Sequence, residues 1–286
     1  MEYHILSCQW SEYALLDFGE GWRWEQWGEF SLQRPDGWAL GMPAIPRTQW
    51  KATYVYHPIS HYQGEWRPPL PEKWRLTYYG KGWRMQLWAR KGRFKHLGVF
   101  PEQAAHWEWL YACLKGKSGM QVLNLFAYTG GASLAAALAG AQVTHVDSSK
   151  SALKWAAENA RLNQISTIRW IPEDAKRFVE RMVRKGRKYY GILLDPPTYG
   201  VGAGGRRWEL EKDLPNLLPS VAQLLSPEGG LLLINIYSGE ISPLTLFRLT
   251  LESVPFLEKK VELGELVLLT PQRRSLSTGV YLRAHW

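Results

Sequence analysis

The stretch that decides the fold reads VLNLFAYTGGASLAAALAGAQVTHVD, at residues 122–147. An apolar run ends at Phe126, and a break follows at residues 129–131. An Ala/Leu-rich segment with helical spacing then leads to a second apolar run that ends on Asp147. This order predicts a strand, a glycine turn, a helix and a strand, which together form one βαβ unit. Parallel strands joined in this way are buried on both faces, which explains their apolar sequences.

The glycine turn has the features of a nucleoside site. Glycine lets the backbone approach a ligand at the carboxyl end of the first strand, and Asp147 at the end of the second strand can accept hydrogen bonds from ribose hydroxyls. The stretch lacks the G-x-G-x-x-G and G-x-x-x-x-G-K-[ST] patterns that bind a pyrophosphate. S-adenosylmethionine has a ribose and an adenine but no phosphate, so it fits. The alternative at this point is a structural turn without a ligand.

A second motif follows further along the chain, where the apolar run 192–194 passes into Asp195-Pro196-Pro197. The prolines end the strand and fix the backbone after it. With this motif the chain resembles the class I S-adenosylmethionine-dependent methyltransferases, and within them the branch of bacterial large-subunit (23S) ribosomal RNA methyltransferases. The segments that carry the resemblance are residues 94–103, 124–163, 173–175 and 193–200.

Helices and strands are expected to alternate after Asp147. The expected elements are helices at 148–162, 174–184 and 210–225 and from 243, and strands at 167–171, 189–194, 231–236, 261–269 and 280–284. This alternation predicts an α/β fold with a doubly wound, mostly parallel sheet. The resemblance implies seven strands, with the last two at an antiparallel edge. We expect a methyltransferase domain at residues 94–286 and a smaller antiparallel β domain at residues 1–93.

The N-terminal third differs in composition from the rest. Twelve of the sixteen tryptophans lie before residue 111, and turn signals recur every few residues up to about residue 72, which is typical of small antiparallel β structure. The alternation at residues 22–27 predicts that its tryptophans share one face of a strand. We expect most of these tryptophans to be core residues, and a base-stacking platform is the alternative.

The segment 73–100 is strongly basic. It holds eight Lys/Arg residues and no Asp or Glu, and aromatic residues lie between them. Basic groups neutralise phosphates and aromatic rings stack on bases, so this segment is the candidate RNA contact. A solvated hairpin whose aromatics face the core is the alternative. The expected RNA-binding residues, including two from the glycine-rich loop 200–207, are Arg75, Lys81, Arg84, Arg90, Lys91, Arg93, Arg206 and Arg207.

The resemblance also implies which residues bind the cofactor. The glycine turn holds the amino acid end of S-adenosylmethionine, Asp147 holds the ribose hydroxyls, and Asp174 with Ala175 meets the adenine amino group. The implied cofactor-binding residues are Gln103, Asn124, Phe126, Tyr128, Thr129, Gly130, Gly131, Asp147, Ser148, Asp174, Ala175 and Asp195.

The expected catalytic residues are Asp195, Pro196, Pro197 and Tyr199. Methyl transfer from a sulfonium is an in-line displacement, so the enzyme mainly aligns a nucleophile. The Asp195 carboxylate and the Pro196 carbonyl can accept hydrogen bonds from an amino group, and Tyr199 can stack on a base. The amino-methylating pattern has an aromatic residue directly after the second proline, where this chain has Thr198, and this departure weakens the choice of an exocyclic nitrogen.

Composition narrows the remaining possibilities. A net charge of +9 predicts a polyanionic partner, although a soluble protein with spare lysines is the alternative. Cys8 and Cys113 form no disulfide framework or zinc site, which fits a reducing cytosol, and we expect no metal. We find no signal peptide and no apolar run that spans a bilayer, so we expect a cytoplasmic protein, either monomer or homodimer.

The function expected from these patterns is methylation of a base of ribosomal RNA. A nitrogen acceptor is favoured, because carbon-5 methylation needs a cysteine nucleophile and neither Cys8 nor Cys113 lies near the fourth or fifth predicted strand. The alternatives are a methyltransferase for a protein or a small molecule and a non-catalytic RNA-binding module. A dehydrogenase is disfavoured by the missing third glycine.

Overall fold

The computed structural model describes residues 3–60, 63–92, 95–201, 207–258 and 260–286. The chain forms two compact units. The larger unit comprises Met1–Leu6, His106–Leu266 and Gly279–Trp286, and the smaller comprises Ser7–Ala105 and Val267–Thr278. These limits differ from the predicted domains 1–93 and 94–286, since each unit takes residues from both.

An eight-stranded sheet is the framework of the larger unit. Its strands, in spatial order, are β1 (Tyr3–Leu6), β16 (Val261–Leu269), β17 (Ser275–His285), β15 (Leu231–Ile236), β12 (Gly191–Leu194), β9 (Gln121–Leu125), β10 (Gln142–Asp147) and β11 (Ile168–Pro172). The five strands from β15 to β11 run parallel, and β17 is antiparallel to β15. The doubly wound sheet with an antiparallel edge is therefore confirmed.

The predicted count of seven strands is wrong by one. The additional strand is β1, which pairs parallel with β16 at the edge of the sheet. Its sequence, Tyr-His-Ile-Leu, is short, and Tyr3 and Ile5 are exposed. A strand that buries so little apolar surface has no clear pattern, which is why the sequence did not predict it.

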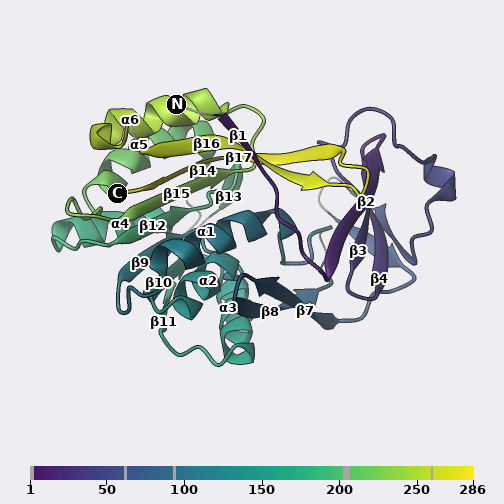
Figure 1. Cartoon of the computed structure of the whole chain (residues 1–286), viewed down its shortest axis with the longest axis horizontal. Coiled ribbons are helices and arrows are strands. Elements are labelled where there is room, and N and C mark those ends of the chain that lie inside the picture. The colour runs from purple at the N-terminus through teal and green to yellow at the C-terminus, as the bar shows by residue number, and fades with distance from the viewer. Residues whose placement is uncertain (1–2, 61–62, 93–94, 202–206, 259) are drawn as a thin grey trace. The chain divides into compact units, whose positions relative to one another are not determined.

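Two layers of helices cover the sheet, as Figure 1 shows with α1 and α2 on one side of the strands and α5 and α6 on the other. The helices are α1 (Ala104–Leu114), α2 (Gly131–Leu138), α3 (Lys150–Leu162), α4 (Ala175–Arg184), α5 (Leu210–Ala222) and α6 (Pro243–Ser253). Two short elements complete this part, η3 (Pro255–Leu257) and the two-stranded pair of β13 (Tyr199–Val201) with β14 (Arg207–Glu209), while η2 (Pro101–Gln103) belongs to the smaller unit. Among the helices in the described ranges, none combines the length and the apolarity that a bilayer crossing requires.

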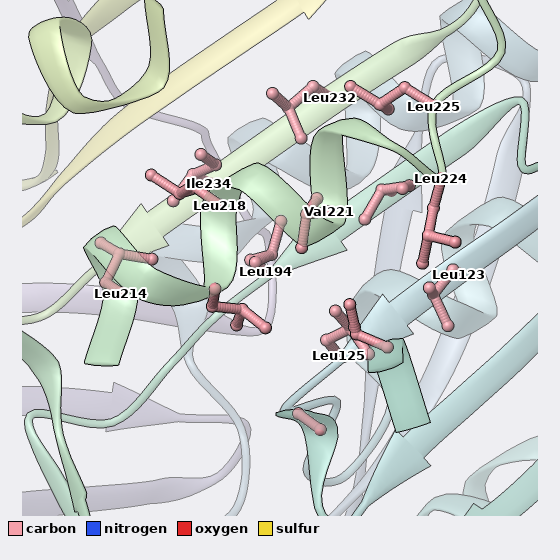
Figure 2. Close-up of a cluster of buried hydrophobic side chains, with 14 of the residues drawn as sticks. Leu123, Leu125, Leu194, Leu214, Leu218, Val221, Leu224, Leu225, Leu232 and Ile234 are labelled. Carbon is pink, nitrogen blue, oxygen red and sulfur yellow. The ribbon is translucent and has the colours of Figure 1, made fainter. Parts of the chain in front are cut away.

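Side-chain alternation on β9 separates the two faces of the sheet. Leu123 and Leu125 are fully buried in the apolar core that α4, α5 and α6 complete (Figure 2). Asn124, between them, points to the opposite face, where it contacts α2. The sheet is therefore stabilised by apolar side chains buried on both of its faces. Residues that bind a ligand are expected at the ends of its strands.

The smaller unit is an antiparallel β structure with one parallel pair. Its five-stranded sheet comprises β2 (Tyr13–Gly19), β3 (Trp22–Trp27), β4 (Phe30–Pro35), β5 (Tyr54–Pro58) and β6 (Gly64–Arg67), with β4 and β5 parallel. The remaining elements are η1 (Arg47–Gln49) and the hairpin β7 (Lys73–Gly80) and β8 (Trp83–Arg90).

The face of β3 that points into the core is not the predicted one. Trp27 is fully buried, but it shares its face with Arg23 and Glu25, whereas Trp22 and Trp24 are half-buried on the other face. The prediction that the tryptophans at 22–27 share a face is therefore wrong. The alternation has a period of two, so position 27 lies opposite positions 22 and 24.

Buried charges hold this core together. Arg34 donates two hydrogen bonds to Glu25, from Nε at 2.6 Å and from Nη2 at 3.0 Å, and the Tyr13 hydroxyl donates a third at 2.9 Å. Arg23 lies 3.2 Å from Asp36. Burial raises the pKa of Glu25, but Arg23, Arg34 and the hydrogen bonds outweigh burial and lower it to about 2. A carboxylate with this many partners is stable in the core only as the anion.

We expect Glu25→Gln to destabilise the protein at neutral pH and to lose this effect in acid. Because the folded-state pKa of about 2 lies below the ordinary 4.5, the stabilisation is complete above pH 4.5 and disappears as the pH falls toward 2. The shift corresponds to on the order of 3 kcal/mol at neutral pH. Urea unfolding of both proteins at several pH values measures the difference.

The matched control is Glu65→Gln, which removes an exposed carboxylate paired with Arg67 in the same unit. It should have little effect at any pH, because exposed ion pairs contribute little. A difference between wild type and Glu25→Gln that stays constant down to about pH 3 would contradict the role of the buried anion.

Candidate functional site

The turn after β9 has an unusual backbone. Phe126 (φ 56°), Tyr128 (φ 46°) and Gly130 (φ 91°) all adopt the left-handed conformation within five residues. For a residue with a Cβ this costs roughly 1–2 kcal/mol, and such strain is typical of functional sites. Asn159 of α3 stabilises the turn, because its Nδ2 donates to the Thr129 carbonyl at 3.0 Å.

Packing explains both glycines of the turn. A Cβ on Gly131 would lie 2.8 Å from the Trp107 ring, and one on Gly130 would lie 3.2 Å from the Ala156 side chain. Gly130 also has the left-handed φ that glycine adopts most readily. The glycines are thus required by the neighbouring helices and are not by themselves a sign of a ligand.

Asp147 ties the end of β10 to the turn. Its Oδ2 accepts a hydrogen bond from the Tyr128 backbone at 2.8 Å, and its Oδ1 accepts one from the Ser149 backbone at 2.8 Å. Burial raises the pKa of this carboxyl group, and the two backbone hydrogen bonds oppose that effect. Each carboxylate oxygen has a second lone pair, so Asp147 retains acceptor capacity for ribose hydroxyls.

A buried polar chain lies beneath the turn. Asn124 donates to the Ser133 hydroxyl at 2.9 Å, and that hydroxyl lies 2.9 Å from Nδ1 of His145. Burial lowers the pKa of His145 to about 3, so the ring is neutral and serves as a structural hydrogen-bond partner. Asn124 is 3% exposed, and its described side-chain contact supports the turn from below.

Asp195 follows β12 and is fixed by the next strand. Its Oδ1 accepts a hydrogen bond from Nδ2 of Asn235, near the end of β15, at 2.9 Å. The Pro197 carbonyl accepts one from the Trp208 indole at 2.7 Å, and the Thr198 hydroxyl donates to the Tyr237 carbonyl at 3.4 Å. The Asp195-Pro196-Pro197 segment is therefore held from both sides.

Strand register brings the two aspartates to one edge of the sheet. Leu125 of β9 pairs with Val146 of β10 and with Leu194 of β12, so the three strands end at the same level. The next residues are Phe126, Asp147 and Asp195, and Asp147 and Asp195 flank Phe126. With strands about 4.8 Å apart, the two aspartate backbones lie about 10 Å apart, which one nucleoside-bearing cofactor can bridge.

The other expected cofactor residues of the larger unit lie around this edge or support it. Asp174 caps α4 by accepting a hydrogen bond from the Arg177 backbone at 3.1 Å, and Ala175 is buried in the core. The Phe126 ring lies 4.8 Å from that of Trp208, while Tyr128 is 38% exposed beside Trp155. Ser148 joins Asp147 to the cap of α3. Gln103 is buried and belongs to the smaller unit.

Alternation on the β7–β8 hairpin places three of the expected RNA-binding residues, Arg75, Arg84 and Arg90, on one face. Arg75 pairs with Trp88, Tyr79 with Arg84, and Lys73 with Arg90. We call these six residues the basic face. Lys73, Arg75, Tyr79 and Arg84 are exposed, and the opposite face is apolar and buried.

The remaining expected site residues have separate positions. Lys81 is exposed in the hairpin turn, and Lys91 forms an ion pair with Glu72 at 2.6 Å. Tyr199 and Arg207 are exposed on the β13–β14 pair. Arg93 and Arg206 lie outside the described residues.

Sequence reasoning missed the residues that support the site. Asn235 is the one polar residue within the apolar run Leu-Leu-Leu-Ile-Asn-Ile, and this signal was available. Trp208, Asn159 and the Ser133–His145 pair gave no local signal, because their partners lie on other elements. In the described part of the chain, no group of three or more His, Cys, Asp or Glu residues could hold a metal ion.

Known S-adenosylmethionine-dependent methyltransferases resemble this chain in sequence and in structure. The sequence model of the S-adenosylmethionine-dependent methyltransferase family matches residues 46–267. A crystal structure of a SAM-dependent methyltransferase from Agrobacterium tumefaciens is 38% identical, covers 99% of this chain and 93% of its own, and superposes with a TM-score of 0.90. SMU.776, a putative methyltransferase complexed with SAH, shares the fold at 19% identity, covering 98% of this chain and 76% of its own, with a TM-score of 0.72.

Curated relatives match a shorter stretch. The ribosomal RNA large subunit methyltransferase K/L of Shewanella frigidimarina is 38% identical over 124 residues, which is 41% of this chain and 17% of that protein. The protein of the same name in Pseudoalteromonas translucida is 42% identical over 115 residues, or 40% of this chain and 16% of that protein. The match thus spans about a sixth of these relatives. The family match and the Agrobacterium structure show that this chain belongs to the S-adenosylmethionine-dependent methyltransferase family.

Proposed function

We propose that this methyltransferase acts on RNA, with a base nitrogen of ribosomal RNA as the methyl acceptor. Methyl transfer is supported by one observation: the strands β9, β10 and β12 end at the same level of the sheet. This register puts Asp147 and Asp195 on either side of Phe126. The RNA part is supported by the basic face and by the ribosomal RNA methyltransferase names of the curated relatives.

The residues around the glycine turn fit the cofactor. Asp147 is held by two backbone N–H groups and keeps lone pairs for the ribose hydroxyls. The turn at residues 128–131 would hold the amino acid end, and Asp174 at the start of α4 would meet the adenine. Bound S-adenosylmethionine supplies a methyl group that its sulfonium has already activated. The protein therefore needs to orient the acceptor, exclude water and leave the acceptor lone pair free.

Asp195 is the residue that orients the acceptor. Its carboxylate can accept a hydrogen bond from an amino group, as can the Pro196 carbonyl, and this directs the nitrogen lone pair. Asn235 donates a hydrogen bond to Oδ1 of Asp195 and so fixes the orientation of the carboxylate. Tyr199 is 64% exposed and is available to stack on the base.

The two cysteines support a nitrogen acceptor over carbon 5. Carbon-5 methylation needs a thiolate that adds to the pyrimidine ring. Burial raises the pKa of Cys113, on α1, which keeps that thiol protonated. Cys8 belongs to the smaller unit, away in sequence from the Asp195 motif.

The basic face supports an RNA substrate through its chemistry. Lys73, Arg75 and Arg84 present cations to solvent along one side of a β-ribbon, and Tyr79 presents an aromatic ring beside them. Cations of this kind neutralise phosphates, and exposed rings stack on unpaired bases. The apolar underside of the hairpin holds the strands in place.

We expect one methylated ribosomal nucleoside to disappear in cells that lack this protein. Ribosomal RNA from the deletion strain, digested to nucleosides and compared with wild type by mass spectrometry, identifies the position. The wild-type gene should restore the methyl group, and the Asp195→Ala gene should not, because the acceptor is no longer oriented. An unchanged nucleoside profile would instead favour a protein or small-molecule substrate.

We expect Asp147→Ala to weaken S-adenosylmethionine binding by at least about 100-fold, because two hydrogen bonds to a charged group are lost and each contributes about 1.5–3 kcal/mol. Isothermal titration calorimetry measures the affinity. The matched control is Asp213→Ala, which removes a carboxylate that accepts a hydrogen bond from the Glu209 backbone at the start of α5. Equal affinity in Asp147→Ala and wild type would rule out the assigned role.

We expect Asn235→Ala to slow methyl transfer by about 10- to 100-fold and to leave the S-adenosylmethionine affinity within about twofold, because Asn235 acts through the orientation of Asp195. Single-turnover transfer of labelled methyl groups to the RNA identified above gives the rate. Asn216→Ala, an exposed position on α5 in the same unit, is the control. A loss of affinity without a loss of rate would contradict the positioning role.

A further inference from the structure

The smaller unit contains a cavity of about 580 Å³ that the proposed methyl-transfer site does not use. Its lining residues, all within the smaller unit, include Ser7, Cys8, Trp10, Tyr79, Thr270 and Arg273. The volume lies in the range of small-ligand sites, and the lining is mixed polar and apolar. A cavity of this size admits one nucleotide but no duplex.

The cavity has a rigid aromatic wall. The Trp10 indole donates a hydrogen bond to the Thr77 carbonyl at 2.6 Å, and its ring packs edge-on against Tyr78 at 5.7 Å. The Cys8 sulfur lies 3.0 Å from the Tyr78 hydroxyl. These contacts fix Trp10 and Cys8 against the β7 strand, so the wall is formed before any ligand binds.

Arg273 lies on a rigid turn at the rim. The Arg273 backbone donates to the Thr270 carbonyl at 2.8 Å, and Thr270 donates to the Arg274 carbonyl at 2.9 Å. Arg274 is bound to Asp17 at 2.5 Å and to the Met42 carbonyl at 2.8 Å. Arg273 itself adopts the left-handed conformation (φ 62°), which the anchored neighbours maintain. Its exposed guanidinium is therefore presented from a fixed backbone.

The charge of the lining favours an anion. Among the described residues that line the cavity, Arg273 is the one charged side chain, and none is a carboxylate. Tyr79 belongs both to this lining and to the basic face, where it pairs with Arg84. The cavity and the basic face thus share this aromatic residue, and each of them also contains an arginine.

We propose that this cavity holds one unpaired nucleotide of the bound RNA, with its base stacked on Tyr79 and its phosphate paired with Arg273. Unpaired bases are the parts of RNA that proteins read by stacking, and a guanidinium pairs with a phosphate through parallel hydrogen bonds. Ser7 supplies a hydroxyl for the base edge. The inference rests on the proposed RNA substrate and names a nucleotide subsite in the smaller unit.

Cys8 provides a direct test, because it lies in the cavity and Cys113 lies in the larger unit. The intact protein is alkylated with N-ethylmaleimide, with and without a saturating single-stranded RNA of about 12 nucleotides, and both cysteine peptides are followed by mass spectrometry. RNA should slow the modification of Cys8 several-fold and leave Cys113 unchanged. Free adenosine 5′-monophosphate in a parallel arm distinguishes a free nucleotide from an RNA-borne one.

Variants of the two contact residues complete the test. Tyr79→Ala and Arg273→Asn should each weaken RNA binding by about tenfold in fluorescence anisotropy and abolish the protection of Cys8. Asparagine tolerates the left-handed backbone at position 273. Tyr79→Phe, which keeps the ring, and Arg248→Asn, which removes an exposed arginine of α6 in the larger unit, should bind RNA like wild type.

The outcomes separate this subsite from the proposed function. If RNA binds and is methylated while Cys8 reacts at its free rate, the subsite is overturned and the RNA methyltransferase function stands. If adenosine 5′-monophosphate protects Cys8 and RNA does not, the cavity takes a free nucleotide and the inference also fails. If no RNA binds at all, the subsite and the proposed RNA substrate fail together.

Discussion

The carboxylate of Asp147 is the constraint on which the candidate site depends. It accepts hydrogen bonds from Tyr128 in the glycine turn and from Ser149 at the cap of α3. One side chain thus joins the end of β10 to the end of β9 and to the start of the next helix. The left-handed turn would otherwise be costly, because Phe126 and Tyr128 both carry a Cβ.

The two units stabilise their buried polar groups in different ways. In the larger unit a chain of the neutral side chains of Asn124, Ser133 and His145 supports the turn. In the smaller unit the core contains the charged pair Glu25 and Arg34, with each carboxylate oxygen bonded. Burial alone would make such a pair costly, and the full set of hydrogen bonds makes it tolerable.

The sequence predicted those parts of the fold that have local signals. The strand–turn–helix–strand order around Asp147 and the helices that follow it are confirmed, because alternation, glycine and helical spacing act over a few positions. β1 was missed because its four residues bury little surface. Trp27 was placed on the face of Trp22 and Trp24 although its odd-numbered position puts it on the opposite face of the strand.

The residues of the candidate site that lie at strand ends were predictable from the sequence, but the residues that hold them in place were not. Asp147 and Asp195 end apolar runs, so their places at one edge follow from the parallel sheet. Asn235 and Trp208 fix the Asp195 segment from residues distant in sequence, and no local pattern encodes such pairs. Predicting the basic face required knowledge of the register of β7 with β8, which the sequence alone did not provide.

The parallel pairing of β1 with β16 has a consequence for dividing the chain. Tyr3–Leu6 belongs to the large sheet, while Val267–Thr278 belongs to the smaller unit, so neither unit is a continuous segment. A fragment that ends at residue 93 would contain β1 without its partner strand β16. The unpaired N–H and C=O groups of β1 would then promote aggregation. The two units are therefore interleaved along the polypeptide, and no single cut in the chain separates two complete units.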